Sequence, residues 1–294
     1  MRWYKVLLLF TPGLALAAQA GPSKPVPAAG GWQTLPHYAH VVVVIEENKS
    51  FSTIIGSKDA PYINRLAGTG VLFTDAHAVT HPSQPNYIAL FSGSTQGVTD
   101  DSCPHDLNGP NLAGAMQERK LEFAIYSEDM PAAGFTDCSA NGGLYRRKHN
   151  PVADWQAGLP AAVNQPFSAF PQDYSRLPML SFVVPNMMDD MHDGTIAQGD
   201  SWLQQHLDDY ARWAMQHDSL LVITWDESDA GSPSNRIPML MVGAGIKPGS
   251  NTQYLTHYSL LRTLTDMYGL KAFGNATAAQ PIRGIWTRAR SGPR

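Results

Sequence analysis

The chain has 294 residues, of which 43% are hydrophobic and 16% are charged, so it is neither an intrinsically disordered chain nor a coiled coil, and it is long enough to bury a sizeable core. Its formal net charge is −4, which argues against a nucleic acid as its main partner. The chain contains two cysteines, which excludes Cys-rich zinc modules and small disulfide scaffolds.

Residues 1–20 have the pattern of a secretory signal peptide. Arg2 and Lys5 precede an apolar stretch that ends at the small-residue pattern Ala18-Gln19-Ala20, as in signal peptides that are cleaved on export. A membrane anchor is the alternative, but the apolar run is short and Pro12-Gly13 interrupts it. We therefore expect a secreted or periplasmic protein with a Pro/Ala/Gly-rich linker at 21–37, a single domain at 38–294 and no stable membrane insertion.

After the linker, apolar runs of strand length alternate with helical patterns. Residues 40–45 include four consecutive valines, which is typical of a parallel strand buried on both faces. Further strands are predicted at 71–73, 121–126, 180–184, 220–224 and 239–242, and helices at 61–67, 84–91, 201–216 and 258–268. The alternation predicts one doubly wound α/β domain with a mostly parallel sheet and helices on both faces. Residues 128–178 are mostly loop and are expected to form an excursion over one end of the sheet.

Cys103 and Cys138 are the two residues that could form a disulfide, and export would make that bridge chemically possible. We expect the bridge to form and to contribute on the order of 3–4 kcal/mol to stability. Two free, buried thiols are the alternative.

Acidic residues follow three of the predicted strands. The first strand ends in Glu46-Glu47-Asn48, residues 189–194 follow the strand at 180–184, and the strand at 220–224 runs into Trp225-Asp226-Glu227. The carboxyl ends of parallel strands share one edge of the sheet, where open α/β proteins bind their ligands. Carboxylates gathered there repel one another and require a cation, and oxygen ligands favour Ca²⁺, Mg²⁺ or Mn²⁺. Acids scattered along a polar rim are the alternative.

The segment Thr80-His81-Pro82-Ser83-Gln84-Pro85-Asn86-Tyr87 is the second informative feature. Pro85 fits the first position of a helix, with Ser83 just before it, so the serine hydroxyl would lie at the positive helix end, where anions bind. By itself Ser83 would be an ordinary N-cap. Beside the acidic clusters we favour a nucleophile, because a metal-bound serine can lose its proton and attack phosphorus. The serine-hydrolase motif is not matched, since residues 93–97 have threonine at the centre.

These stretches resemble the bacterial phosphoesterase family of the alkaline-phosphatase-like superfamily. The resemblance is carried by residues 45–50, 80–87, 186–200 and 224–227, with further likeness at 145–151 and 256–261. It extends over nearly all of residues 38–285, in the expected order. It implies an alkaline-phosphatase-like α/β fold and the chemistry of a phosphoric ester hydrolase.

The resemblance also implies a role for each residue of the site. The metal ligands would be Glu47, Asn48, Ser83, Asp226 and Glu227 around one divalent ion; the catalytic residues would be Ser83 and His192; and the substrate contacts would be His81, Asn86, Lys148, His149 and Asp193. A structural histidine at 192 and a solvated cationic loop at 146–149 are the alternatives. Asn186 and Asp190 stand where two-metal relatives supply aspartate and histidine, so a second metal is not implied. His257 either belongs to the site or only begins its helix.

The function that follows is a secreted, metal-dependent acid phosphatase that hydrolyses phosphate monoesters through a phosphoserine intermediate. Its expected substrates are small phosphate monoesters and phosphoinositide headgroups. A phospholipase C-type diesterase is the alternative within the family, and a periplasmic anion-binding protein is the alternative that is not an enzyme. The acidic chain and its single short cationic run, residues 146–149, favour the monoesterase, because a basic face is what attracts an anionic lipid surface.

Overall fold

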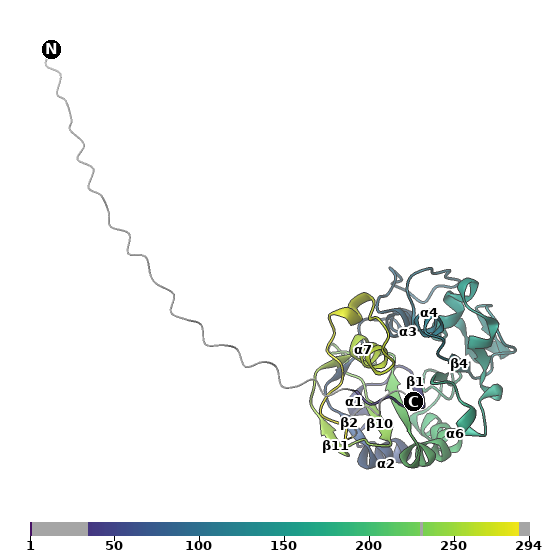
Figure 1. Cartoon of the computed structure of the whole chain (residues 1–294), viewed down its shortest axis with the longest axis vertical. Helices are drawn as coiled ribbons and strands as arrows, with labels where there is room; N and C mark the ends of the chain where they lie inside the picture. Colours follow the sequence, from purple (N-terminus) through teal and green to yellow (C-terminus); the bar gives the residue numbers. More distant parts are fainter. Residues whose placement is uncertain (2–34, 230–231, 288–294) are drawn as a thin grey trace. The chain divides into compact units, whose positions relative to one another are not determined.

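An eight-stranded sheet runs through the middle of the part of the chain that the structure describes (Figure 1). This structure is a computed structural model, and it describes residues 35–229 and 232–287, together with Met1. Apart from Met1 and residues 35–37, the predicted signal peptide and linker lie outside the described residues. Among the described residues, no helix combines the length and the apolar character needed to cross a membrane.

The order of the strands in the sheet is β11-β2-β10-β9-β1-β8-β4-β7. Their bounds are β1 His40–Glu46, β2 Val71–Phe73, β4 Phe123–Ser127, β7 Asn164–Pro166, β8 Leu180–Val184, β9 Ser219–Trp225, β10 Met239–Gly243 and β11 Gly249–Asn251. β1 lies between β8 and β9 and is parallel to both. Two small sheets accompany the large one and pair β3 (Ala76–His77) with β12 (Leu255–Thr256) and β5 (Ser139–Ala140) with β6 (Tyr145–Arg146).

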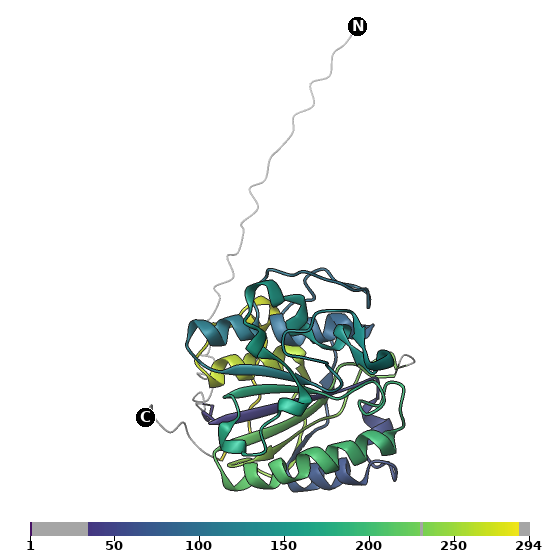
Figure 2. The ribbon, with the colours of Figure 1, turned by 90° about the vertical axis from the view of Figure 1, so that its right-hand side faces the viewer.

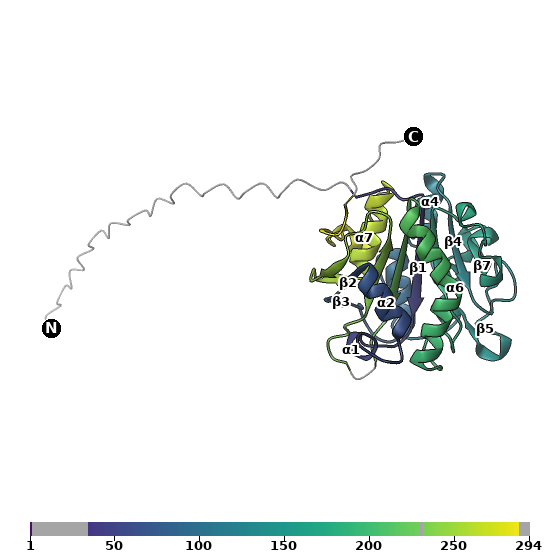
Figure 3. The same cartoon turned by 90° about the horizontal axis from the view of Figure 1, so that it is seen from below.

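Helices cover both faces of the large sheet, which explains why its central strands are apolar on both sides. α2 (Pro61–Thr69) and the long α6 (Ile196–Gln216) pack together on one face, where α6 contacts β9 and β10 (Figure 3). α3 (Ser83–Ser92), α4 (Leu112–Glu118) and α7 (His257–Met267) lie on the opposite face (Figure 2). The short helices are α1 Phe51–Ile54, α5 Pro151–Asp154, η1 Asn141–Gly143, η2 Arg147–His149, η3 Gln156–Gly158, η4 Ala161–Val163, η5 Phe167–Ala169, η6 Tyr174–Arg176 and η7 Gly274–Thr277.

The predicted α/β class, with a mostly parallel sheet and helices on both faces, is confirmed, but one strand runs the other way. β10 is antiparallel to both β9 and β2. The described residues between β9 and β10 form no helix, and a parallel pair needs a long crossover connection, usually a helix. The edge strands β7 and β11 were not predicted, because each has only three residues and no apolar run.

The segment predicted as an excursion, residues 128–178, consists mainly of short elements, as expected. It contains the β5–β6 hairpin, several single-turn helices and the edge strand β7. η2 within this segment packs against α3. The excursion therefore brings Lys148 and His149 to the helix that carries Ser83.

Candidate active site

The ends of β1 and β9 bring together the acidic clusters at residues 46–48 and 225–227. The strands are parallel and pair Glu46 with Trp225, so Glu47 and Asp226 leave the sheet side by side. The backbone N–H of Asp226 donates to the Glu46 carbonyl at 2.9 Å, and the N–H of Asn48 donates to Asp226 Oδ1 at 3.0 Å. Asn48 has φ of 52°, a left-handed conformation that asparagine tolerates better than most residues. The sharp turn at Asn48 thus directs both carboxylates into one space.

Ser83 enters this space from α3. Its hydroxyl lies 3.1 Å from Glu47 Oε2 and 3.2 Å from Glu227 Oε1, and Ser83 is only 1% exposed. The Ser83 hydroxyl has one hydrogen, so its hydrogen bond is shared between the two carboxylates. The structure thus brings together all five predicted ligands, which come from the ends of β1 and β9 and from the start of α3.

The start of α3 differs from the prediction. The helix begins at Ser83 with Pro82 as its N-cap, so Pro85 is the third helical residue rather than the first. Proline is accommodated there because the N–H groups of the first turn have no partner within the helix. Ser83 is therefore the first residue of the helix, and its side chain projects from the helix end toward the carboxylates.

The three carboxylates are buried, and this disfavours their charged forms. Burial raises the pKa of Glu47 to about 8. Burial, together with the neighbouring Asp226, also raises the pKa of Glu227 to about 8. Burial and the Glu47 charge raise the pKa of Asp226 well above its ordinary value. Such a cluster is stable in its ionised form only if a positive charge joins it.

The donor set fits a hard divalent cation. Among the described residues, Asp226 Oδ2 is buried without a hydrogen-bond donor, and Glu47 Oε1 has only the close, unaligned approach of His149. The Asn48 amide nitrogen donates to Glu47 Oε2 at 2.8 Å, so its carbonyl oxygen is the atom a cation would use. Within the described ranges, His, Cys, Asp and Glu side chains alone form no group of three or more arranged to hold a metal. The fit therefore depends on the orphaned carboxylate oxygens and on the serine and asparagine oxygens.

His149 lies directly behind these carboxylates. Its Nε2 is 2.8 Å from Glu47 Oε1 and its Nδ1 is 3.3 Å from Asp190 Oδ2, while its ring stacks on Tyr87 at a centroid distance of 5.1 Å. Burial lowers the pKa of His149 and raises the pKa of Asp190 to about 7. His149, which the resemblance predicts as a substrate contact, is thus a buried residue that orients Glu47.

His81 lies at the open side of the site. Its Nδ1 forms a close contact with Glu227 Oε2, and 40% of its side chain is exposed. Burial of the remaining part lowers the pKa of His81. His81 can therefore face a substrate while its other ring nitrogen holds Glu227.

His192 and Asp193 form a pair beside the buried His149. His192 Nδ1 contacts Asp193 Oδ1 at 2.7 Å, and the His192 ring centroid is 5.9 Å from that of His149. Burial lowers the pKa of His192. The side chains of His192 and Asp193 are 28% and 54% exposed, so the pair lies at the rim of the site.

The resemblance predicts Asn86 as a substrate contact, but the side chain of Asn86 bonds to the backbone of its own loop. Its Oδ1 accepts hydrogen bonds from the N–H groups of Val79 and Thr80, and its amide nitrogen donates to the carbonyls of Thr80 and Pro82. Both amide hydrogens are used in this way. Asn86 therefore fixes the loop that precedes Ser83, which favours a positioning role over substrate contact.

His257 supports the site from the first residue of α7. Its Nε2 lies 2.6 Å from the Asp226 carbonyl oxygen, and burial lowers its pKa to about 4. The helix is capped instead by Thr256 and Ser259. His257 thus holds the loop that carries Asp226 and Glu227.

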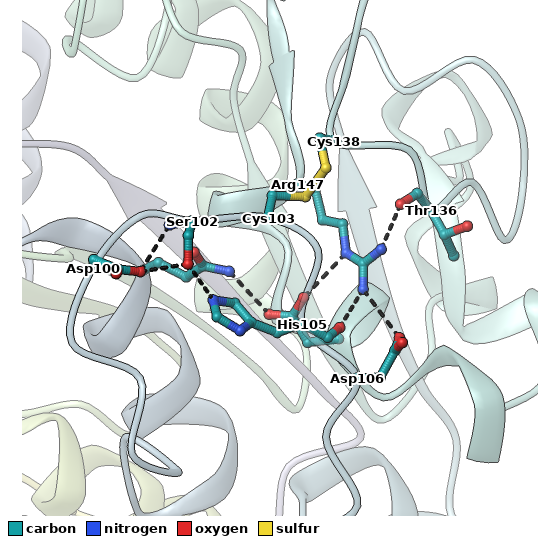
Figure 4. The surroundings of a disulfide bond; sticks show 10 residues. Asp100, Ser102, Cys103, His105, Asp106, Thr136, Cys138 and Arg147 are labelled. Carbon is teal, nitrogen blue, oxygen red and sulfur yellow. Dashed lines mark hydrogen bonds and ion pairs between the residues drawn. A yellow bond between two sulfur atoms is a disulfide. The ribbon is translucent and has the colours of Figure 1, made fainter.

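A disulfide and an arginine fasten the loops beside the site (Figure 4). The predicted Cys103–Cys138 bridge is confirmed and closes a separation of 35 residues, which contributes about 3–4 kcal/mol by the loop-entropy relation. The buried Arg147 guanidinium donates to the carbonyls of Thr136 and His105 and to Asp154 Oδ1. The disulfide and Arg147 together fix the segments that flank η2.

The sequence patterns did not assign Tyr87, Asp190 or Asp101 a role in this site. Tyr87 and Asp190 lie within stretches that the sequence singles out, but their contacts with His149 depend on the fold. Asp101 lies in a loop with no motif, and its side chain accepts from Gln84 N–H and from Lys148. Only the tertiary structure shows its place beside the nucleophile.

Comparisons with known proteins identify the family of the chain. The model of a family described as "Phosphoesterase family" matches residues 56–271. The chain is 50% identical to a phosphatidylinositol-3-phosphatase of Mycobacterium tuberculosis, over 86% of this chain and 84% of that protein. It is 32% identical to a phosphate-repressible acid phosphatase of Penicillium chrysogenum, over 72% of this chain and 55% of the fungal protein.

A solved structure supports the fold. A protein of the alkaline phosphatase superfamily from Vibrio parahaemolyticus superposes with a TM-score of 0.57 at 13% identity, over 85% of this chain and 71% of that chain. At this identity the likeness concerns the fold alone. It confirms the expected alkaline-phosphatase-like architecture.

Proposed function

The chain belongs to the phosphoesterase family, and from this premise we propose that it is a metal-dependent phosphomonoesterase with Ser83 as its nucleophile. The observation that carries the proposal is the Ser83 hydroxyl at the start of α3, 3.1 and 3.2 Å from two buried carboxylates. Family membership makes the chain a phosphoric ester hydrolase. The geometry of Ser83 supports one route for that hydrolysis.

We propose that Glu47, Asn48, Ser83, Asp226 and Glu227 hold one divalent ion. Such an ion, when bound, neutralises the carboxylates, favours the ionised serine and stabilises negative charge on the phosphoryl group. Ca²⁺, Mg²⁺ and Mn²⁺ suit the oxygen-only donor set.

The side chains of the site then have separate roles in the reaction. Ser83 gives its proton to one of the adjacent carboxylates, and its Oγ forms a bond to phosphorus as the bond from phosphorus to the ester oxygen breaks. The leaving oxygen takes a proton from the protonated form of His192, which Asp193 orients through Nδ1. Water next attacks the phosphoserine and gives a proton to the now neutral His192. The bond from phosphorus to Ser83 Oγ breaks, the carboxylate returns its proton to Ser83 Oγ, and inorganic phosphate leaves. His81 lies at the open side, where it can contact the phosphate.

For the substrate we propose phosphate monoesters, including the headgroups of phosphoinositides. The support is the 50% identity to a phosphatidylinositol-3-phosphatase and the likeness to a fungal acid phosphatase. The predicted signal peptide supports action outside the cytoplasm.

The test of this function compares monoesters with diesters. We expect kcat/KM for nitrophenyl phosphate to exceed that for bis-nitrophenyl phosphate by about 100-fold or more, because the site is built to bind a terminal phosphoryl group and discrimination of about 3 kcal/mol corresponds to that factor. Release of phosphate from nitrophenyl phosphate and release of diacylglycerol from phosphatidylcholine are measured in parallel. Faster release of diacylglycerol than of phosphate from the monoester would show a phospholipase C instead.

Chelation should destabilise the protein more at high pH than at low pH. In the metal-free protein the pKa of Glu47 and of Glu227 is raised to about 8 by burial, so the stability contributed by their neutral forms is complete below about pH 4 and is lost as the pH rises toward 8. A bound cation offsets this loss. We therefore expect the difference in Tm between metal-loaded and EDTA-treated protein to grow from pH 5 to pH 8. Equal differences at both values would contradict the metal site.

A further inference from the structure

A carboxylate outside the proposed metal site lies directly beside the nucleophile. Asp101 Oδ1 accepts a hydrogen bond from the backbone N–H of Gln84 at 2.9 Å, and Gln84 is the residue after Ser83 in α3. Asp101 Oδ2 accepts from Lys148 Nζ at 2.9 Å. One carboxylate thus joins the start of the nucleophile helix to an ammonium group.

Both members of this pair are charged and partly shielded. Burial alone would raise the pKa of Asp101, but the Gln84 and Lys148 hydrogen bonds outweigh it and lower the pKa. Burial alone would lower the pKa of Lys148, but Asp101 and the Glu47 charge raise it. The side chain of Lys148 is 16% exposed and that of Asp101 is 30% exposed. The ammonium group therefore lies near solvent, but its contact with Asp101 restricts its movement.

The loops that carry Asp101 and Lys148 are fastened to each other. Cys103 lies two residues after Asp101 and is joined to Cys138. The backbone N–H of Arg147 donates to the Cys138 carbonyl at 3.1 Å, and its guanidinium holds the carbonyl of His105 (Figure 4). Lys148 follows Arg147 directly, so the pair is assembled before any substrate arrives.

We propose that Asp101 is a positioning residue that holds the Lys148 ammonium beside Ser83, where Lys148 binds the phosphate group of the ester. An ammonium has three hydrogens, and the bond to Asp101 uses one of them. The others can reach an anion placed at the start of α3. Without Asp101, the flexible lysine side chain would have to be ordered by the substrate itself, which weakens binding. The inference rests on the proposed function and adds a residue that neither holds the metal nor touches the reacting atoms.

A double-mutant cycle tests this arrangement. Asp101→Asn and Lys148→Met are made singly and together, and KM, kcat and the calorimetric Kd for inorganic phosphate are measured with metal present. Asp101→Asn keeps an oxygen that can accept from Gln84 N–H, so the helix start stays capped. We expect each single change to raise KM and the phosphate Kd by about 10-fold with little change in kcat, since each removes a hydrogen bond between charged groups. The double variant should be no weaker than Lys148→Met.

The neighbouring Asp100 provides the matched control. Its carboxylate accepts only local hydrogen bonds, from the N–H and hydroxyl of Ser102, so Asp100→Asn removes the same charge one residue away and should leave KM and Kd unchanged. Asp101→Ser, which can still cap Gln84, replaces Asp101→Asn if the latter does not fold.

Two results would overturn the inference. Equal weakening of phosphate binding by Asp101→Asn in the wild-type and Lys148→Met backgrounds would make Asp101 a cap of α3 only. An unchanged Kd in Lys148→Met would remove Lys148 from the phosphate site. Absence of monoester turnover in the wild-type protein would contradict the proposed function instead, and the phosphate Kd values would still decide the role of Asp101.

Discussion

Replacement of Ser83 by alanine is expected to lower monoester hydrolysis by about 1,000-fold or more, because removal of a nucleophile leaves only the rate enhancement from binding and electrostatics. The variant should remain folded. Ser83 Oγ contacts Glu47 and Glu227 only through hydrogen bonds shared between two acceptors, and their loss has a modest effect on stability. Activity on nitrophenyl phosphate and thermal unfolding measure the two effects separately.

Ser92→Ala is the matched control, since Ser92 is a buried serine at the other end of the same helix. It should retain the wild-type rate. If Ser83→Ala keeps a tenth or more of the activity, the nucleophile is another group, with Thr80 or a bound water as the next candidates.

Asp226→Asn should lower both the bound metal and the rate, the latter by about 100-fold or more, since even second-sphere changes at metal sites cost about 10–100-fold. The substitution keeps the shape of the side chain and its acceptor for Asn48 N–H but removes the charge that the buried cluster offers to a cation. Elemental analysis of the purified variant gives the metal content, and steady-state kinetics with added metal gives the rate.

Asp200→Asn is the control for loss of a buried acid. Asp200 accepts from the N–H groups of Tyr62 and Ile63 at the start of α2, on the other face of the sheet from α3. Asp200→Asn should reduce the free energy of unfolding by about 1–3 kcal/mol without changing the metal content. Unchanged metal in Asp226→Asn, or equal loss of metal in both variants, would contradict the assigned ligands.

The fold class, the central strands and the meeting of polar residues at the strand ends could be predicted from the sequence. The four consecutive valines of β1 predict a strand buried on both faces, and helices do cover both faces of the sheet around β1. Glu47 and Asp226 could be placed together because parallel strands end at one edge, and their register aligns them. These features follow from local pattern and from the geometry of parallel sheets, so no knowledge of side-chain packing was needed.

Side-chain partners in the site were decided by the tertiary structure. Asn86 and Lys148 belong to sequence stretches that suggest substrate contact. The structure shows that Asn86 holds the loop before Ser83 and that Asp101 orients Lys148. The direction of β10 and the contact of His257 with the Asp226 carbonyl likewise had no local signal. Each depends on residues far apart in the chain that meet only when the layers pack. A pattern along the sequence reports which residues are near in the chain and which face they share, whereas a hydrogen bond needs partners within about 3 Å in space.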